Sequence, residues 1–158
     1  MPLYLIRHAH AGSRSAWDGD DTRRPLSSRG EGQAQAVASQ LADAGIDLLW
    51  TSPYLRCRQT LEPLARKLGL EILDSEAFAE GTAGPVALDA ALDAVASGRT
   101  LAVCSHGDVI PDLASAAVRR GADLVGGNAL KKGARFDCTV VDGQIARLVN
   151  VAPPDGTT

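Results

Sequence analysis

The stretch YLIRHAHAG, residues 4–12, decides both the fold class and the place of a candidate site. Residues 2–6 form an apolar run that is too short for a helix and is typical of a buried strand. The run ends abruptly in Arg7 and His8, and two of the chain's three histidines lie in this stretch. The third, His106, directly follows the apolar run LAVCS. The first question is therefore whether two strand ends bring these histidines to one place.

Short apolar runs alternate with amphipathic segments along most of the chain. Strands are expected at 2–6, 46–52, 70–73 and 100–105, and helices from Ser28 to Gly45, from Ser52 to Gly69, at 86–97 and at 109–119. Ser52 is the expected N-cap, with Pro53 in the first helical position. Two β-rich runs flank Asp142-Gly143 within 135–151, which predicts a hairpin with a type I′ turn.

This alternation predicts an α/β fold, a three-layer α/β/α sandwich whose mainly parallel sheet carries a C-terminal antiparallel hairpin at an edge. The 158 residues suggest a single domain, which we expect over 1–152, with a flexible tail at 153–158. The polar loop at 13–27 is long enough to suggest a functional role.

Composition excludes several classes of protein. The net charge of −3 argues against a duplex nucleic-acid binder, which is usually basic. The sequence shows no secretory signal pattern, and no apolar run approaches the roughly 18 residues of a membrane span. The three widely spaced cysteines predict reduced thiols and a cytoplasmic location rather than a disulfide framework. No feature predicts an oligomeric state.

The charged groups are expected to converge, because ligands of open α/β sheets bind beyond the carboxyl ends of the strands. Arg7 and His8 follow the first strand, Arg56 opens the helix after the second, and His106 follows LAVCS. Two guanidiniums suit a phosphate or a carboxylate, and a histidine among them can act as a nucleophile. No nucleotide-binding glycine motif accompanies them.

Three ordered motifs, LIRHAHAG, SPYLRCRQT and VCSHGDVIPDL, resemble the histidine phosphatase superfamily with its phosphoglycerate mutase-like fold. The likeness is to the compact branch, with SixA-type phosphohistidine phosphatases and the domain that follows a Nudix domain in some MutT-type enzymes. It runs over nearly the whole chain, the DDTRRPLSSRG loop and the terminal hairpin included.

The resemblance implies a metal-independent phosphatase without a cofactor. His8 would accept the phosphoryl group and pass it to water, while Arg7, Arg56 and His106 contact its oxygens. Glu80 lies where relatives often place a general acid, with Asp108 as the alternative. Arg24 either faces the incoming phosphate or pairs with Asp20 and Asp21.

Two departures from the family pattern bear on the expected activity and substrate. Ala9 stands where glycine is commonest in the family, at a position that varies among SixA-like members. Only about fifty positions separate Arg56 from His106, so the insertion of the mutase-type members is missing. The resulting open pocket disfavours sugar-phosphate mutase activity and suits a phosphorylated protein or an extended substrate.

Alternatives remain open at this point. The substrate is a phosphohistidine, or a nucleotide or other small phosphate ester; a non-catalytic phosphate- or partner-binding module of the same fold is a further hypothesis. A metal site through His8, His10 and His106 lacks supporting ligands in the sequence, so His10 is expected to be a neighbour of the site. Lys131 and Lys132 are expected in a solvated turn.

Overall fold

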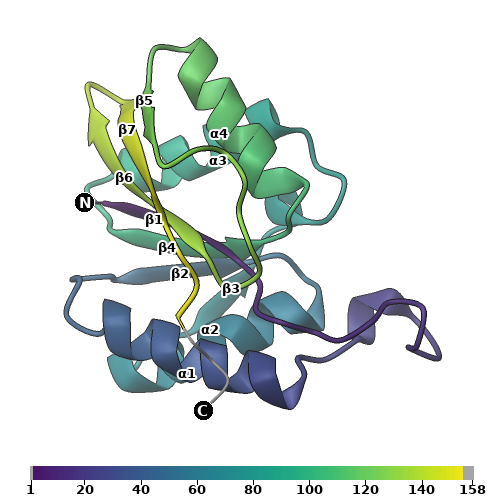
Figure 1. Ribbon diagram of the computed structural model, residues 1–158. Coiled ribbons are helices and arrows are strands. Elements are labelled where there is room, and N and C mark those ends of the chain that lie inside the picture. Colours follow the sequence, from purple (N-terminus) through teal and green to yellow (C-terminus); the bar gives the residue numbers. More distant parts are fainter. Residues whose placement is uncertain (1, 155–158) are drawn as a thin grey trace.

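A single seven-stranded sheet organises the computed structural model, which describes residues 2–154 (Figure 1). The strand order is β3-β2-β4-β1-β6-β7-β5. The strands are β1 (Leu3–Arg7), β2 (Leu48–Thr51), β3 (Ile72–Asp74), β4 (Leu101–Ser105), β5 (Asp123–Val125), β6 (Arg135–Val141) and β7 (Gln144–Val151). The helices are α1 (Ser28–Leu41), α2 (Leu55–Leu68), α3 (Gly84–Val95) and α4 (Val109–Arg119), with short 3-10 turns η1 (Asp21–Arg23) and η2 (Glu76–Phe78).

The expected three layers are confirmed. Helices α1 and α2 cover one face of the sheet, and α3 and α4 cover the other (Figure 1). Strand β1 supplies both cores, because Leu3 and Leu5 pack on the α3/α4 side while Tyr4 and Ile6 pack on the α1/α2 side. Burial on both faces explains why the run that opens the chain is continuously apolar instead of alternating.

Strand β1 lies at the centre and pairs parallel with β4 and antiparallel with β6. Its last residue, Arg7, is in register with Ser105 at the end of β4. The carboxyl ends of β1 and β4 therefore leave the sheet side by side, so Arg7-His8 and His106 are delivered to one edge.

The terminal hairpin is also confirmed, since Asp142 and Gly143 both have the positive φ, 50° and 77°, that a type I′ turn requires. Its place in the sheet differs from the expectation. The short strand β5, which sequence patterning did not predict, pairs parallel with β7 and forms the outer edge. Three residues are too few to show a period, which is why the pattern missed it.

The predicted N-cap of α2 is wrong. The helix begins at Leu55 and its N-cap is Tyr54, which makes no side-chain capping bond. The Ser52 hydroxyl instead contacts His106, so its side chain serves the candidate site rather than the helix end.

Two further expectations concern the ends of the chain and membranes. Residues 155–158 of the expected tail lie outside the described residues. Within residues 2–154, no helix has the length and apolar character needed to span a bilayer.

Candidate active site

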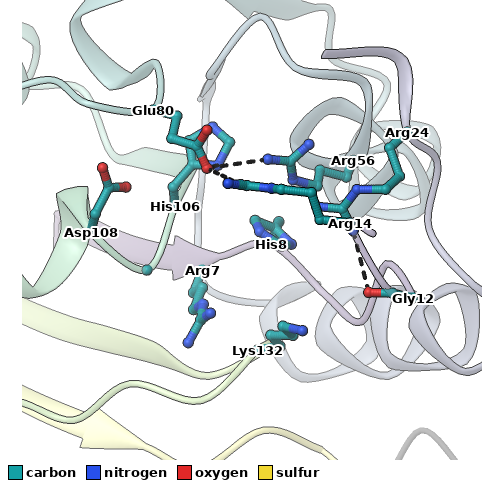
Figure 2. A pocket seen from close by; sticks show the side chains of 11 residues that line it. Arg7, His8, Gly12, Arg14, Arg24, Arg56, Glu80, His106, Asp108 and Lys132 are labelled. Carbon is teal, nitrogen blue, oxygen red and sulfur yellow. Dashed lines mark hydrogen bonds and ion pairs between the residues drawn. The ribbon is translucent and has the colours of Figure 1, made fainter. Parts of the chain in front are cut away.

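A cavity of about 460 Å³ opens at the carboxyl ends of β1 and β4 (Figure 2). Its lining is mostly cationic, with five arginine or lysine side chains and two carboxylates. The lining residues are Arg7, His8, Gly12, Arg14, Arg24, Arg56, Glu80, His106, Gly107, Asp108 and Lys132. Every predicted site residue is among them, so the two histidine motifs do form one site.

His8 lies at the centre of this group and is only 6% exposed. Its Nδ1 lies 2.8 Å from the carbonyl oxygen of Ala9, and because a carbonyl only accepts, Nδ1 carries the proton. Burial lowers the pKa of His8 to about 3; the bond to Ala9 opposes the shift, while His106, Arg56 and Arg7 add to it. At neutral pH the ring is therefore uncharged, and Nε2 keeps a free lone pair.

Arg7 follows the same strand and is anchored at one end only. Its Nη1 donates to the Leu130 carbonyl at 2.7 Å, whereas its buried Nε has no partner. Gly107 permits this position, because a Cβ added there would lie 2.6 Å from the guanidinium carbon. The chain after β4 thus packs directly against the Arg7 side chain.

Arg56, in the first turn of α2, is fully buried. Its Nη1 donates to the Asp21 carbonyl at 2.9 Å, and its Nη2 lies 3.2 Å from Asp21 Oδ2 and 3.4 Å from Glu80 Oε1. The guanidinium also lies 4.9 Å from the centroid of the Tyr54 ring. These partners compensate the buried charge, yet they leave the Nε of Arg56 without a partner.

His106 is oriented by Ser52. The Ser52 Oγ accepts the backbone N–H of Tyr54 at 3.3 Å, so its own proton is available to donate to His106 Nε2 at 2.8 Å. In that arrangement the ring proton of His106 is at Nδ1. This buried Nδ1 has no partner within 3.5 Å and lies 4.0 Å from Glu80 Oε1.

Four buried side-chain nitrogen or oxygen atoms within residues 2–154 lack a hydrogen-bond partner. One is Asn128 Oδ1, and the other three are the nitrogens just described: Arg7 Nε, Arg56 Nε and His106 Nδ1. Buried polar groups in folded proteins are almost always paired. Three unpaired donors on the residues around His8 therefore indicate a site shaped for an anion that supplies several acceptor oxygens.

Glu80 and Asp108 stand on one side of the cavity (Figure 2). Glu80 accepts from Arg14 at 2.7 Å and from Arg56 at 3.4 Å. Asp108 accepts the backbone N–H of Gly81 at 2.9 Å, so it holds the segment that carries Glu80. Of the two expected acids, Glu80 is the one whose carboxylate faces the cationic groups.

The loop at 13–27 supplies more of the site than sequence reasoning expected. Arg24 pairs with Asp21 at 3.0 Å, one of the two expected partners, and donates to the Ala11 carbonyl; it also lines the cavity. Arg14 and Asp21 were not singled out for the site. The only signal for Asp21 was the opposite charge of the DDTRR run, which does not reveal its contact with Arg56.

Lys131 and Lys132 lie at a turn, as expected, and Lys131 is exposed, but Lys132 is not a freely solvated side chain. The side chain is half-buried and lines the cavity beside Arg7. The turn is held in place because the Gly133 N–H donates to the backbone carbonyls of Arg7 and His8. This pairing joins positions far apart in the sequence, and nothing in the local pattern announces it.

His10 is a neighbour of the site, as predicted. It does not line the main cavity, and its Nδ1 lies 2.6 Å from the Ser27 hydroxyl that caps α1. Within residues 2–154 no three histidine, cysteine, aspartate or glutamate side chains are grouped to hold a metal ion. The three cysteines are free and buried.

Comparisons with known proteins agree with this geometry. The family model of the histidine phosphatase superfamily (branch 1) matches residues 3–87. An 8-oxo-(d)GTP phosphatase of Mycolicibacterium smegmatis is 33% identical over 158 aligned positions, which cover 97% of this chain but 48% of the relative. This chain thus spans about half the length of that relative.

Solved structures show the same fold. The protein histidine phosphatase SixA in complex with tungstate superposes with a TM-score of 0.72 at 18% identity, covering 99% of this chain and 97% of that one. Mycobacterial hydrolase 1 gives a TM-score of 0.73 at 16% identity, covering 97% and 98%.

Proposed function

Because this chain belongs to the histidine phosphatase superfamily (branch 1), we propose that it is a phosphatase in which His8 accepts the phosphoryl group and then passes it to water. One observation carries the proposal: the unpartnered donors of Arg7, Arg56 and His106 gather around His8. A phosphoryl group offers acceptor oxygens to all three. The charge-bearing groups are side chains of the protein, so the proposed reaction uses no metal ion or cofactor.

The reaction then has two in-line transfers. The Nε2 lone pair of His8 attacks phosphorus, and the bond from phosphorus to the leaving atom breaks. That atom is an oxygen in a phosphate ester or an imidazole nitrogen in a phosphohistidine, and a leaving oxygen takes a proton from an acid. In the second step water attacks phosphorus, the phosphorus–Nε2 bond breaks, and the water gives a proton to the same group. Arg7, Arg56 and His106 stabilise the charge on the phosphoryl oxygens in both steps.

The low pKa of His8 supports the nucleophilic role, since the ring stays unprotonated throughout the neutral range. The hydrogen bond from Nδ1 to the Ala9 carbonyl fixes the ring orientation. An imidazole fixed in one orientation and one tautomer loses little freedom when it attacks.

We assign the acid to Glu80 on geometry, since its carboxylate lies 3.4 Å from Arg56 and 4.0 Å from His106. A phosphohistidine has a good leaving group and needs little acid assistance, whereas an alkyl phosphate needs it. Glu80→Gln should therefore slow alkyl phosphate hydrolysis far more than phosphohistidine hydrolysis. Equal losses on both substrates would remove Glu80 from the acid role.

The site identifies the substrate less directly than it identifies the type of reaction. The open cationic cavity suits a phosphohistidine presented on the surface of a protein, in line with the SixA-type fold. The relatedness to an 8-oxo-(d)GTP phosphatase favours a nucleotide or another small phosphate ester as the second candidate. Both are phosphorylated substrates of the same chemistry.

The decisive experiment uses an aryl phosphate in the presence of EDTA. We expect turnover by the unaltered protein, none by His8→Ala, and nearly full turnover by Lys67→Gln, a control at an exposed position of α2 that does not line the cavity. Arg7→Gln should lower kcat/KM by about 10²–10³, the usual effect of losing one charge-stabilising donor.

Acid quenching during turnover should trap acid-labile phosphate on the unaltered protein and none on His8→Ala. Tight phosphate binding without turnover or phosphoenzyme would instead identify a non-catalytic phosphate-binding module. Turnover that His8→Ala leaves unchanged would place the chemistry elsewhere.

A further inference from the structure

A second cavity, of about 310 Å³, adjoins the first and shares Arg7 and Lys132 with it. Figure 2 shows these two side chains on the side of His8 away from Glu80. The other lining residues are His10, Arg29, Gln33, Lys131 and Pro153. We call this second cavity the basic annex.

The lining of the annex is positively charged, and no aspartate or glutamate of residues 2–154 is part of it. It contains two lysines and two arginines. Within residues 2–154, none of Arg29, Lys131 and Lys132 has an aspartate or glutamate oxygen within 4.0 Å, whereas Arg14, Arg24 and Arg56 of the main cavity all do. Among the described residues, an anion in the annex would therefore meet no carboxylate in the lining.

Two groups in the annex, Lys132 and His10, both have a lowered pKa. Burial lowers the pKa of Lys132, and Arg7, Arg24, Arg56 and Arg29 lower it further. Burial, Lys132 and Arg29 likewise lower the pKa of His10. Burial is the larger cause of both shifts, and repulsion from neighbouring cations adds to it; a bound anion would relieve that repulsion.

The backbone around the annex is tied down. Gln33 Oε1 accepts the His10 N–H at 2.9 Å, and its Nε2 donates to the Lys132 carbonyl at 3.4 Å. Gln33 therefore links α1 and the segment after β1 to the lysine turn. Arg29 is in the first turn of the same helix. The cations therefore lie on elements that are fixed to the segment after β1, which contains His8, so their distance from His8 is fixed as well.

We propose that the basic annex binds a second anionic group of the substrate, a phosphate or a carboxylate, while the scissile phosphoryl group lies at His8. The inference rests on the proposed phosphatase function and specifies its substrate class, a phosphorylated compound with a further negative charge several bonds from the scissile phosphorus. Arg7 and Lys132 line both cavities, so a substrate of sufficient length would contact both.

Kinetics with paired compounds test this assignment. Alkanediol bisphosphates of increasing chain length are compared with the hydroxyalkyl monophosphates of the same length, and with carboxyalkyl phosphates to tell a phosphate from a carboxylate. One bisphosphate length should have a KM at least about tenfold below its monophosphate, as expected for one added charge-assisted contact. Arg29→Gln and Lys131→Gln should remove that advantage and leave monophosphate kinetics nearly unchanged.

Lys67→Gln is the matched control, because it removes an exposed lysine on α2 that lines neither cavity. An equal loss of the bisphosphate advantage in Lys67→Gln would show that the effect comes from the overall charge of the protein. Two outcomes would overturn the proposal that the annex binds a second anionic group. One is a bisphosphate advantage that remains in the double variant Arg29→Gln, Lys131→Gln, and the other is no advantage at any chain length.

Calorimetry separates failure of the annex from failure of the phosphatase function. His8→Ala, checked for folding by circular dichroism, is titrated with the bisphosphate and the monophosphate. Tighter bisphosphate binding that depends on Arg29 and Lys131 would support the annex even if no compound is hydrolysed. Equal binding of both compounds would refute it even in an active enzyme.

Discussion

His8 is a buried histidine that pairs with no carboxylate of residues 2–154, and its burial determines how protonation of its ring affects the stability of the fold. The pKa of His8 is about 3 in the folded protein and about 6.5 in the unfolded chain. Between these values the unfolded state binds a proton that the folded state does not bind. The free energy of unfolding therefore falls as the pH falls from 6.5 toward 3.

We predict that His8→Gln flattens this dependence. Below pH 6.5 the unaltered protein should lose about 1.4 kcal/mol of stability per pH unit more than the variant, since one proton is then taken up on unfolding. Urea denaturation at several pH values measures the two slopes, and all other titrating groups are common to both proteins. Parallel slopes would mean that His8 is already charged in the folded state.

Ser52 acts on the site through His106. Ser52→Ala removes the hydroxyl that donates to His106 Nε2 and frees the ring to place its proton there, away from the cavity. We expect kcat/KM to fall about tenfold, less than the 10²–10³ of a lost direct donor. The tautomer itself is read by nitrogen NMR of the imidazole, with Ser39→Ala on α1 as the control.

An unchanged nitrogen spectrum together with reduced activity would assign Ser52 a packing role only. The positioning role requires both readouts to move together.

At the level of elements, α1 packs unusually close to the segment after β1. A Cβ added at Gly30 would lie 1.9 Å from the His10 carbonyl oxygen, which accepts from the backbone and hydroxyl of Ser27. Because the obstacle is backbone, the helix must move to accommodate a methyl group. Glycine at this position therefore fixes the distance between α1 and the candidate nucleophile's strand.

We predict that Gly30→Ala lowers the free energy of unfolding by about 1–3 kcal/mol, the usual cost of overpacking, despite the better helix propensity of alanine. Activity should fall as well, since α1 also carries Gln33, which bonds to His10 and the lysine turn. Thermal denaturation and aryl phosphate kinetics measure both effects. Ser28→Ala, at an exposed position of the same turn, should change neither.

Elements with a strong local signal were predictable from the sequence. The apolar run before Arg7, the alternation of strands and helices, and the Asp142-Gly143 turn all depend on short-range patterns. The convergence of Arg7, His8, Arg56 and His106 followed from one topological rule, that parallel strands expose their carboxyl ends at one edge.

The remaining site residues depend on long-range contacts. Arg14 meets Glu80, Asp21 meets Arg56, and the turn at Lys132 is held through Gly133 against β1. A solvated loop and a functional loop have the same polar composition, so the sequence pattern alone does not distinguish them. The same applies to Ser52, whose Ser-Pro context is a good helix start even though its hydroxyl faces His106.

For the whole molecule, the net charge of −3 conceals a strongly cationic region. Five of the cavity-lining side chains are positive, and the adjoining annex adds Arg29 and Lys131. Local charge, not net charge, controls which small anions a pocket binds. An acidic isoelectric point is thus compatible with phosphate recognition.

We predict that inorganic phosphate, the expected product, raises the melting temperature of the whole chain. At a hundred times its Kd, phosphate should stabilise the fold by about 2.7 kcal/mol, which for a domain of this size is about 5–10 °C. Differential scanning calorimetry over a phosphate series measures the shift. Potassium chloride at equal ionic strength should produce little shift, because chloride only screens surface charges and does not offer the several acceptor oxygens that the cavity binds.

Two variants serve as a test and a control. Arg7→Gln should reduce the shift in melting temperature that phosphate produces, and Lys67→Gln should not. Equal shifts in all three proteins, or an equal shift with chloride, would mean that phosphate acts only as a salt.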